Sequence, residues 1–384
     1  MDPSYRRRAV AVKAAMRVLG FMTGTSLDAV DMAIIETDGH EVLSLGPAGE
    51  QKLDTATRAV VEEATRAALV WPLGETRPDS FRRAEQAIAQ AHLKAARGFL
   101  DTLGDEGRVD LVGVHGQTVL HEPPTAARAV GRTIQLIDAQ HLADGLGLPV
   151  AFDFRTADVA AGGQGAPLAP IYHAALARRS GLAAPLAVLN LGGVGNVTLI
   201  RPDGGLEAHD TGPANGMIDL WVQARTGARC DVDGALARSG RVNWAIVEAY
   251  LTHPYFRTRG PKSLDRFDFS LELVAGLSIA DGAATLTAFA AQTVKLGVQA
   301  LTMEPLEVIV CGGGRQNPAL MAAIGLQLTV PLRTAEVVGW RGDSIEAEAF
   351  AFLAARTALD LPISFPGTTG APTPLRGGQI LKPA

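Results

Sequence analysis

Near its N-terminus the chain reads Val18-Leu19-Gly20-Phe21-Met22-Thr23-Gly24-Thr25-Ser26-Leu27-Asp28-Ala29-Val30-Asp31-Met32-Ala33-Ile34-Ile35, and near its middle Leu186-Ala187-Val188-Leu189-Asn190-Leu191-Gly192-Gly193-Val194-Gly195-Asn196-Val197-Thr198-Leu199-Ile200. Each segment is an apolar β-prone run, a glycine-rich polar turn and a second β-prone run, which predicts a hairpin. Glycine lets backbone N–H groups approach an anion closely and tolerates positive φ. Two such turns, one in each half, predict two related lobes that hold a phosphate between them, as in a nucleotide-dependent phosphotransferase.

Strand and helix patterns alternate on both sides of these hairpins. We expect helices over 54–69, 79–103, 139–146, 243–251, 286–301 and 344–359, and strands over 109–114, 149–152 and 308–311. This alternation predicts α/β lobes. We expect an N-terminal lobe over 18–175, with 360–384 packing back on it, and a C-terminal lobe over 176–359.

The composition excludes several classes of protein. Of the 384 residues 47% are hydrophobic and 20% charged, and the net charge is −5, which is typical of a globular chain and not of a general nucleic-acid binder. The sequence contains no run of ~18 apolar residues, so we expect no membrane span. We expect residues 1–17 to form a loose extension. Cys230 and Cys311 form no CxxC pair, so we expect buried thiols in a reducing cytosol.

Two glycine-rich turns are candidate phosphate or nucleotide sites. The turn Gly24–Asp28 combines backbone donors, hydroxyls and a carboxylate, which suit phosphate and Mg²⁺, although the same residues are typical of an ordinary β-turn. Gly312, Gly313 and Gly314 follow a short apolar strand, where their lack of side chains would let a nucleotide approach. They form neither a Walker motif nor a full GxGxxG fingerprint, so a plain turn is the alternative.

Two acidic residues are candidates for catalysis. Asp210, in His209-Asp210-Thr211-Gly212-Pro213, could act as a general base or could cap a helix. Glu346 could bind a substrate hydroxyl, or could complete a capping box in which Asp343 is the N-cap.

A third group of residues resembles the polar lining of a sugar pocket. His115, Gln117 and Thr118 follow a predicted strand, where open α/β sheets place ligands, although a lone histidine is more often structural. Asp153 and Arg155 flank a phenylalanine and could form either structural ion pairs or a sugar-binding pair.

Taken in order, these motifs resemble the anhydro-N-acetylmuramic acid kinase family, within the superfamily of sugar kinases, actin and heat-shock ATPases. The matching stretches are 20–28, 115–118, 153–155, 162–167, 189–193, 210–213, 261–263, 311–314 and 342–347. The resemblance implies an α/β fold of two ribonuclease-H-like lobes with an interlobe cleft. Ala29 and Ala214 stand where the family often has glycine.

The resemblance also implies an activity. ATP and Mg²⁺ would be used on 1,6-anhydro-N-acetylmuramic acid, giving N-acetylmuramic acid 6-phosphate in peptidoglycan recycling. Asp210 would activate the water that attacks C1, and the freed O6 would take the γ-phosphoryl group. Glu346 would contact the sugar near the reacting centre.

The resulting assignments cover catalysis, nucleotide and sugar. Asp210 and Glu346 are expected to be catalytic, and Asp28 to bind the metal. The residues expected at the nucleotide are Gly24, Thr25, Ser26, Leu27, Asp28, Ala29, Val30, Asp31, Gly192, Gly193, Asn196, Gly312, Gly313 and Gly314. Those expected at the sugar are His115, Gln117, Thr118, Asp153 and Arg155.

Two alternatives remain open: another sugar or acid kinase of the superfamily, and an ATP-binding relative without turnover. The expected partner is the small amino sugar, with no nucleic acid and no membrane. The family resemblance also suggests a homodimer, and the cysteine usage predicts a cytoplasmic location.

Overall fold

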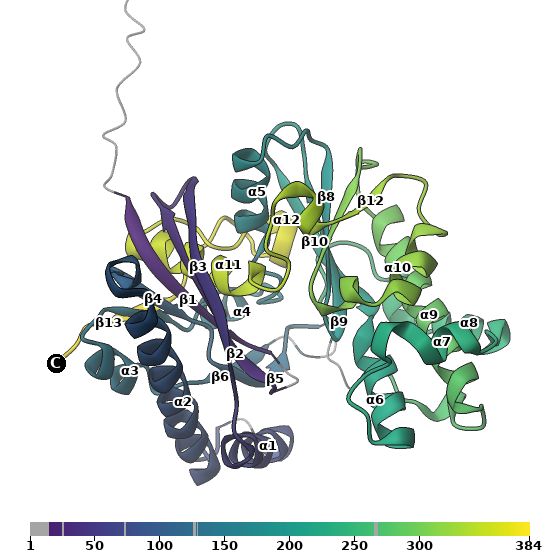
Figure 1. Ribbon diagram of the computed structural model, residues 1–384, viewed down its shortest axis with the longest axis horizontal. Coiled ribbons are helices and arrows are strands. Elements are labelled where there is room, and N and C mark those ends of the chain that lie inside the picture. Colours follow the sequence, from purple (N-terminus) through teal and green to yellow (C-terminus); the bar gives the residue numbers. More distant parts are fainter. Residues whose placement is uncertain (1–14, 25–26, 73, 126–127, 129, 265–267) are drawn as a thin grey trace, which may run out of the picture.

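A computed structural model describes residues 15–24, 27–72, 74–125, 128, 130–264 and 268–384 (Figure 1). Thr25, Ser26 and residues 1–14 of the expected extension lie outside the described residues. The expectation that the loose extension reaches residue 17 is wrong, because the first strand already begins at Met16. The described chain forms two larger β-sheets with helices beside and between them, and a small two-stranded sheet.

The first half supplies the first large sheet and the small sheet. Its strands are β1 (Met16–Thr23), β2 (Ala29–Thr37), β3 (Val42–Lys52), β4 (Leu111–Val114), β5 (Gln117–Glu122), β6 (Arg132–Leu136) and β7 (Val150–Phe152). Its helices are α1 (Thr55–Val70), α2 (Asp79–Leu103), η1 (Gly104–Gly107), α3 (Ala139–Leu146), α4 (Thr156–Ala160) and α5 (Pro170–Arg179).

The second half supplies the second large sheet and the final edge strand of the first. Its strands are β8 (Leu186–Leu191), β9 (Val194–Ile200), β10 (Leu206–Pro213), β11 (Val308–Cys311), β12 (Leu332–Thr334) and β13 (Gln379–Leu381). Its α-helices are α6 (Asn215–Thr226), α7 (Ala235–Ser239), α8 (Trp244–Leu251), α9 (Ile279–Gln299), α10 (Pro318–Gly325), α11 (Ile345–Ala358) and α12 (Pro366–Thr369). Its 3₁₀ helices are η2 (Val232–Gly234), η3 (Pro254–Arg257), η4 (Glu272–Val274), η5 (Gly313–Gln316) and η6 (Ala335–Val338).

The two large sheets repeat one topology. The first has the order β13-β7-β4-β1-β2-β3, and the second β10-β9-β8-β11-β12. In each sheet the glycine hairpin and the next strand form an antiparallel meander, and the first hairpin strand pairs in parallel with a later strand: β1 with β4, and β8 with β11. The predicted α/β fold with two related halves is therefore confirmed.

Helices α5 and α11 lie between the two sheets (Figure 1). One apolar cluster joins them, because it contains Val18 of the first sheet and Val188 of the second, with Tyr172 of α5 and Phe352 of α11. The opposite face of the first sheet buries Leu19 and Phe21 against α1, α2 and α3. Neighbouring residues on β1 thus enter different cores, as the two-residue period of a strand requires.

Two strand glycines let α11 approach the first sheet. Gly20 and Gly113 pair across β1 and β4, and a Cβ on either would collide with the backbone of α11, at Ala347 O and Phe350 O. Strand glycines typically mark such close approaches. As a result α11 packs on the first sheet, although it lies within the segment 176–359 expected to form the C-terminal lobe.

Several expected elements differ from those observed. Strand β3, the β5–β6 hairpin and the short helix α12 were not expected. Helix α9 begins at Ile279, earlier than the expected 286. The expectation that both thiols are buried is wrong for Cys230, which is exposed, whereas Cys311 is buried. Cys230 lies in the connection between α6 and η2.

None of the helices within the described ranges is long and apolar enough to cross a membrane.

Candidate active site

Asp210 lies in the second half of β10, where backbone groups of the segment that contains Lys262 and Leu264 bond to it. Its carboxylate Oδ2 accepts a hydrogen bond from the backbone N–H of Leu264 (2.8 Å), and its own N–H donates to Lys262 O (3.0 Å). The Tyr255 hydroxyl donates to the Asp210 carbonyl (2.5 Å). Asp210 caps no helix, because α6 begins at Asn215 with Ala214 as its N-cap.

The surroundings of Asp210 suit a general base. Asp210 is only 8% exposed, and burial raises the pKa of its carboxyl to about 7, against the Leu264 hydrogen bond and the positive charges of Arg155 and Lys262. A base is most effective when its pKa lies near the working pH. The carboxylate can therefore take a proton near neutrality.

Arg155 is one of the two cations whose charges act on this carboxylate. Its Nε donates to His115 Nε2 (2.9 Å), and its Nη1 to Gly165 O (2.6 Å). Burial lowers the pKa of Arg155 to about 10, while the negative charges of Glu346 and Asp210 act in the opposite direction. Arg155 thus stays charged at neutral pH, close enough to both carboxylates to interact with each.

His115 orients Arg155. Burial, and then the Arg155 charge, hold the pKa of His115 well below its usual value. A neutral imidazole that accepts at Nε2 carries its proton on Nδ1. His115 also packs against the Phe350 ring, with centroids 4.6 Å apart. These contacts make His115 a support for Arg155 at the expected sugar site.

The remaining expected sugar residues divide between two places. Gln117 begins β5, and its Oε1 is buried without a hydrogen-bond partner, so it can accept one from a ligand. Thr118 Oγ1 accepts from Gln135 Nε2 (3.2 Å). Asp153, in contrast, accepts from Gln379 Nε2 (2.9 Å) beside β13, so the structure does not bring it together with Arg155.

Glu346 lies in the first turn of α11 and contacts the second sheet. Asn190, at the end of β8, donates from Nδ2 to Glu346 Oε1 (3.1 Å). Glu346 is exposed as a whole residue, yet desolvation by the protein around its carboxyl raises the pKa of that carboxyl. The Asn190 hydrogen bond and the Arg155 charge act in the opposite direction. The capping-box alternative is wrong, because the N-cap is Ser344, without a side-chain cap bond.

The first glycine turn carries charged side chains. Leu27, at φ 55°, donates its N–H to Gly24 O (3.2 Å). Ala29 and Val30 begin β2 directly after Asp28, whose Oδ2 pairs with Arg229 from the second half of the chain. Burial, followed by the charge of Glu346, raises the pKa of Asp31 to about 7.

The Asp28 carboxylate fits a role at a phosphate-bound cation. Its Oδ1 is a buried oxygen without a hydrogen-bond partner. Among the described residues no three His, Cys, Asp or Glu side chains gather as a metal site. Mg²⁺ at kinase sites usually takes one or two carboxylates, with phosphates and waters as its other ligands. Asp28 therefore suits Mg²⁺ that arrives with a nucleotide.

The second and third glycine turns meet each other. The carbonyls of Gly192 and Gly193 accept hydrogen bonds from the N–H groups at the start of α6 (3.0–3.1 Å). Gly312 has φ 78°, and a Cβ there would collide with Asn190 Oδ1. A Cβ on Gly314 would collide with the Asn215 side chain. Asn196 lies opposite Asn190 in the β8–β9 register.

Sequence reasoning missed several residues that build this site. Asn190 and Asn215 join the two glycine turns, and Asn190 also bonds Glu346. Arg315, directly after the triple glycine, binds the Asp343 carboxylate that was expected to cap α11. The sequence did offer a signal for this pair, because an arginine follows the glycines directly. An arginine that is buried at such a turn needs hydrogen-bond acceptors from elsewhere in the chain.

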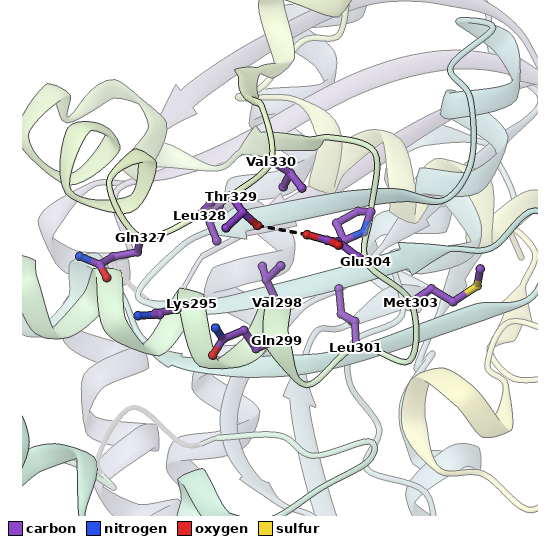
Figure 2. A pocket seen from close by; sticks show the side chains of 11 residues that line it. Lys295, Val298, Gln299, Leu301, Met303, Glu304, Gln327, Leu328, Thr329 and Val330 are labelled. Carbon is purple, nitrogen blue, oxygen red and sulfur yellow. Dashed lines mark hydrogen bonds between the residues drawn. The ribbon is translucent and has the colours of Figure 1, made fainter.

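A shallow hollow of about 220 Å³ lies elsewhere, beside the end of α9 (Figure 2). Lys295, Val298, Leu328 and Val330 contribute to its lining, and Thr329 Oγ1 donates to Glu304 Oε1 (3.1 Å) across it. It contains none of the residues expected to bind nucleotide or sugar, so it is separate from the candidate active site.

Comparisons with known proteins agree with the resemblance. Residues 16–383 match the family model described as anhydro-N-acetylmuramic acid kinase. The anhydro-N-acetylmuramic acid kinase of Caulobacter vibrioides is 60% identical, over 95% of this chain and 99% of that protein. The protein of the same name from Phenylobacterium zucineum is 58% identical, over 96% and 100%.

Solved structures are more distant. Component A of the (R)-2-hydroxyglutaryl-CoA dehydratase of Acidaminococcus fermentans is 13% identical, over 90% of this chain and 99% of that chain, with a TM-score of 0.43. A likeness this weak carries no argument about function.

Proposed function

The chain belongs to the anhydro-N-acetylmuramic acid kinase family, and from that premise we propose how its residues carry out the reaction. The protein is an ATP-dependent kinase that opens the anhydro ring of 1,6-anhydro-N-acetylmuramic acid and phosphorylates O6. The product is N-acetylmuramic acid 6-phosphate. The observation that carries the proposal is that the buried Asp210 carboxyl, whose pKa is about 7, and Glu346 both lie close enough to Arg155 for their charges to interact with it.

Asp210 is the general base in this scheme. Its carboxylate takes a proton from a water as the water oxygen bonds to C1 and the C1–O6 bond breaks, as in an inverting glycosidase. The electron pair of that bond stays on O6, which attacks the γ-phosphorus and displaces ADP. The Leu264 N–H fixes one Asp210 oxygen, which leaves the other for the water.

Arg155, Glu346 and Gln117 orient the sugar. Glu346 accepts from a substrate hydroxyl, because Asn190 already fixes one of its oxygens. The buried Gln117 Oε1 gains the partner that it lacks. Arg155 keeps its charge between the two carboxylates and can bind an anionic group on the sugar.

The glycine turns hold the nucleotide. Gly24–Asp28 lies at the phosphates, and 192–193 and 312–314 approach the nucleotide from the second half. Asp28 would hold Mg²⁺ through its unpartnered oxygen. When bound, Mg²⁺ supplies charge neutralisation on the phosphates. Thr25 and Ser26 belong to this turn by sequence alone.

The decisive experiment follows the oxygen. We expect mass spectrometry of the product formed from ATP, Mg²⁺ and the anhydro sugar in ¹⁸O-water to show a phosphorylated sugar with one ¹⁸O at C1. A phosphorylated sugar without ¹⁸O would indicate another sugar kinase, which uses an existing hydroxyl. ATP binding without any product would indicate a non-catalytic relative.

A homodimer in the cytoplasm completes the proposal. The dimer is suggested by the family alone, and light scattering after size exclusion measures the oligomeric state directly. A monomer at all protein concentrations would contradict the dimer and leave the activity untouched.

A further inference from the structure

Arg315 is a buried arginine that follows the triple glycine at the candidate active site. Its side chain is 5% exposed, and its N–H groups reach three acceptors: Gly312 O, Glu336 and Asp343. The bond to Asp343 is a two-pronged fork, from Nη1 to Oδ1 (2.8 Å) and from Nη2 to Oδ2 (2.7 Å). Such bidentate pairs fix geometry as well as adding energy.

These bonds join segments with different expected tasks. Nη1 also donates to Gly312 O (3.0 Å), so one nitrogen bridges the triple-glycine turn and Asp343. Asp343 lies just before α11, the helix that carries Glu346 and packs on the first sheet. Arg315 thus occupies the point where the nucleotide turn of the second sheet meets a helix of the first.

The backbone packs closely around the Arg315 side chain. A Cβ on Gly342 would collide with Arg315 Nε, and the Gly312 N–H donates to Gly342 O (3.4 Å). Nε of Arg315 donates to Glu336 Oε1 (2.8 Å), which ties the joint to η6. A displacement of the arginine would therefore be transmitted to both the turn and the start of α11.

We propose that Arg315 is a positioning residue for phosphoryl transfer, which holds the Gly312–Gly314 turn in register with Glu346 by gripping Gly312 O and the Asp343 carboxylate. This inference rests on the proposed function, because it assumes that the turn binds ATP and that Glu346 contacts the sugar. Arg315 acts through these groups and touches no reacting atom.

The test combines Arg315→Lys, Asp343→Asn and the double variant in a cycle. Lysine keeps the charge but cannot form the fork. Asp343→Asn leaves no buried hole, because the Asp343 side chain is 67% exposed. We expect each single variant to raise KM for ATP about tenfold and lower kcat about tenfold, with the double variant no worse than either, because residues that act as a unit are not additive. KM for the sugar should also rise, because α11 carries Glu346, whereas Asp343→Asn should change the melting temperature little, because the Asp343 side chain is exposed.

Arg333→Lys is the matched control. Arg333 lies on the neighbouring strand β12 and pairs with Glu307 (3.0 Å), outside the glycine turns. We expect Arg333→Lys to leave kcat and KM for ATP unchanged. Wild-type kinetics in Arg315→Lys, or losses that add in the double variant, would overturn the proposal. A wild-type protein that turns over no anhydro sugar would instead overturn the proposed function.

Discussion

The two glycine hairpins occupy the same place in their sheets but carry different chemistry. We compare the residues that pair across the two strands two positions before each turn. In the first hairpin Met22 pairs with Asp31, and in the second hairpin Asn190 pairs with Asn196. The first turn also contains Asp28, and the second is two glycines whose carbonyls cap α6. One backbone design thus supplies acid groups in one half and neutral amides in the other.

This difference suggests that the two hairpins have different roles at the site. Acid groups beside a phosphate are useful only where a cation accompanies it, so the first hairpin suits the metal-bound phosphates. The second half places its acid on the next strand, at Asp210, and uses the hairpin amide of Asn190 to fix Glu346. The experiments below break or sharpen this contrast.

Asp210→Asn should have the largest effect. The variant loses the general base, so we expect kcat to fall by about 10³-fold, within the range that general-base catalysis supplies. ATP affinity, measured by titration calorimetry, should be unchanged, because the first hairpin is intact. Near wild-type turnover would remove Asp210 from the mechanism.

Asp28→Asn should come next. It makes the first hairpin as neutral as the second, and we expect kcat/KM for ATP to fall by about 10²-fold through lost charge stabilisation. Asn196→Ala is the matched change in the second hairpin, and we expect it to cost far less. Equal losses in both variants would mean that the hairpins bind phosphate in the same way.

The pH profile should reveal Asp210 directly. Its pKa of about 7 means that the base is protonated below neutrality. We therefore expect kcat/KM for the sugar to fall about tenfold for each pH unit below 7, and to level off above it. An acid limb near the ordinary aspartate pKa of 3.8 would show that burial does not perturb this carboxyl.

Asp31→Asn should change stability in a pH-dependent way, which is measured without nucleotide because Asp31 is expected to lie at the nucleotide. Folding raises the pKa of Asp31 from 3.8 to about 7, chiefly by burial and then by the charge of Glu346. The folded state thus holds the proton more tightly, and the stability from this group is complete below about pH 4 and lost as pH rises through 7. Without nucleotide, we expect the variant to melt a few degrees higher at about pH 8 and equally at about pH 4. A shift of the same size at both pH values would contradict this linkage.

Gly193→Ala should have the smallest effect on the fold. The nearest atom to a Cβ there is Gly216 Cα at 3.8 Å, so we expect the free energy of unfolding to change by less than ~0.5 kcal/mol. Gly216→Ala is the control, because its Cβ would lie 2.9 Å from Gly193 O. With stability preserved, a severalfold weaker ATP affinity in Gly193→Ala would place the nucleotide at this turn, and unchanged affinity would exclude close approach.

Local pattern predicted the regular elements well. Helices α2 and α3 and strand β11 have the predicted bounds, because their sequence patterns are local. Strand β3 escaped prediction, since Gly46, Pro47 and Gly49 weaken its pattern; it is an edge strand, where such residues are tolerated. The β5–β6 hairpin was missed because it packs as a separate small sheet.

The candidate site was predicted in its types of residue but not in its contacts. Asp210, Glu346, Arg155 and His115 were singled out from motifs, and the structure brings them together. The residues that orient them, such as Asn190 and Arg315, carry no local signature. Their partners lie 156 and 28 positions away in the chain.

The sequence by itself determined the two hairpins, the α/β alternation and the family, and it supplied the candidate reactive groups, because each depends on local spacing or on ordered motifs. Only the tertiary structure decided that α11 packs on the first sheet, through the room left by Gly20 and Gly113. It also decided that Asp343 binds Arg315 rather than capping its helix. The physical reason is that burial and long-range pairing set these choices, and neither is encoded in the spacing of neighbouring residues.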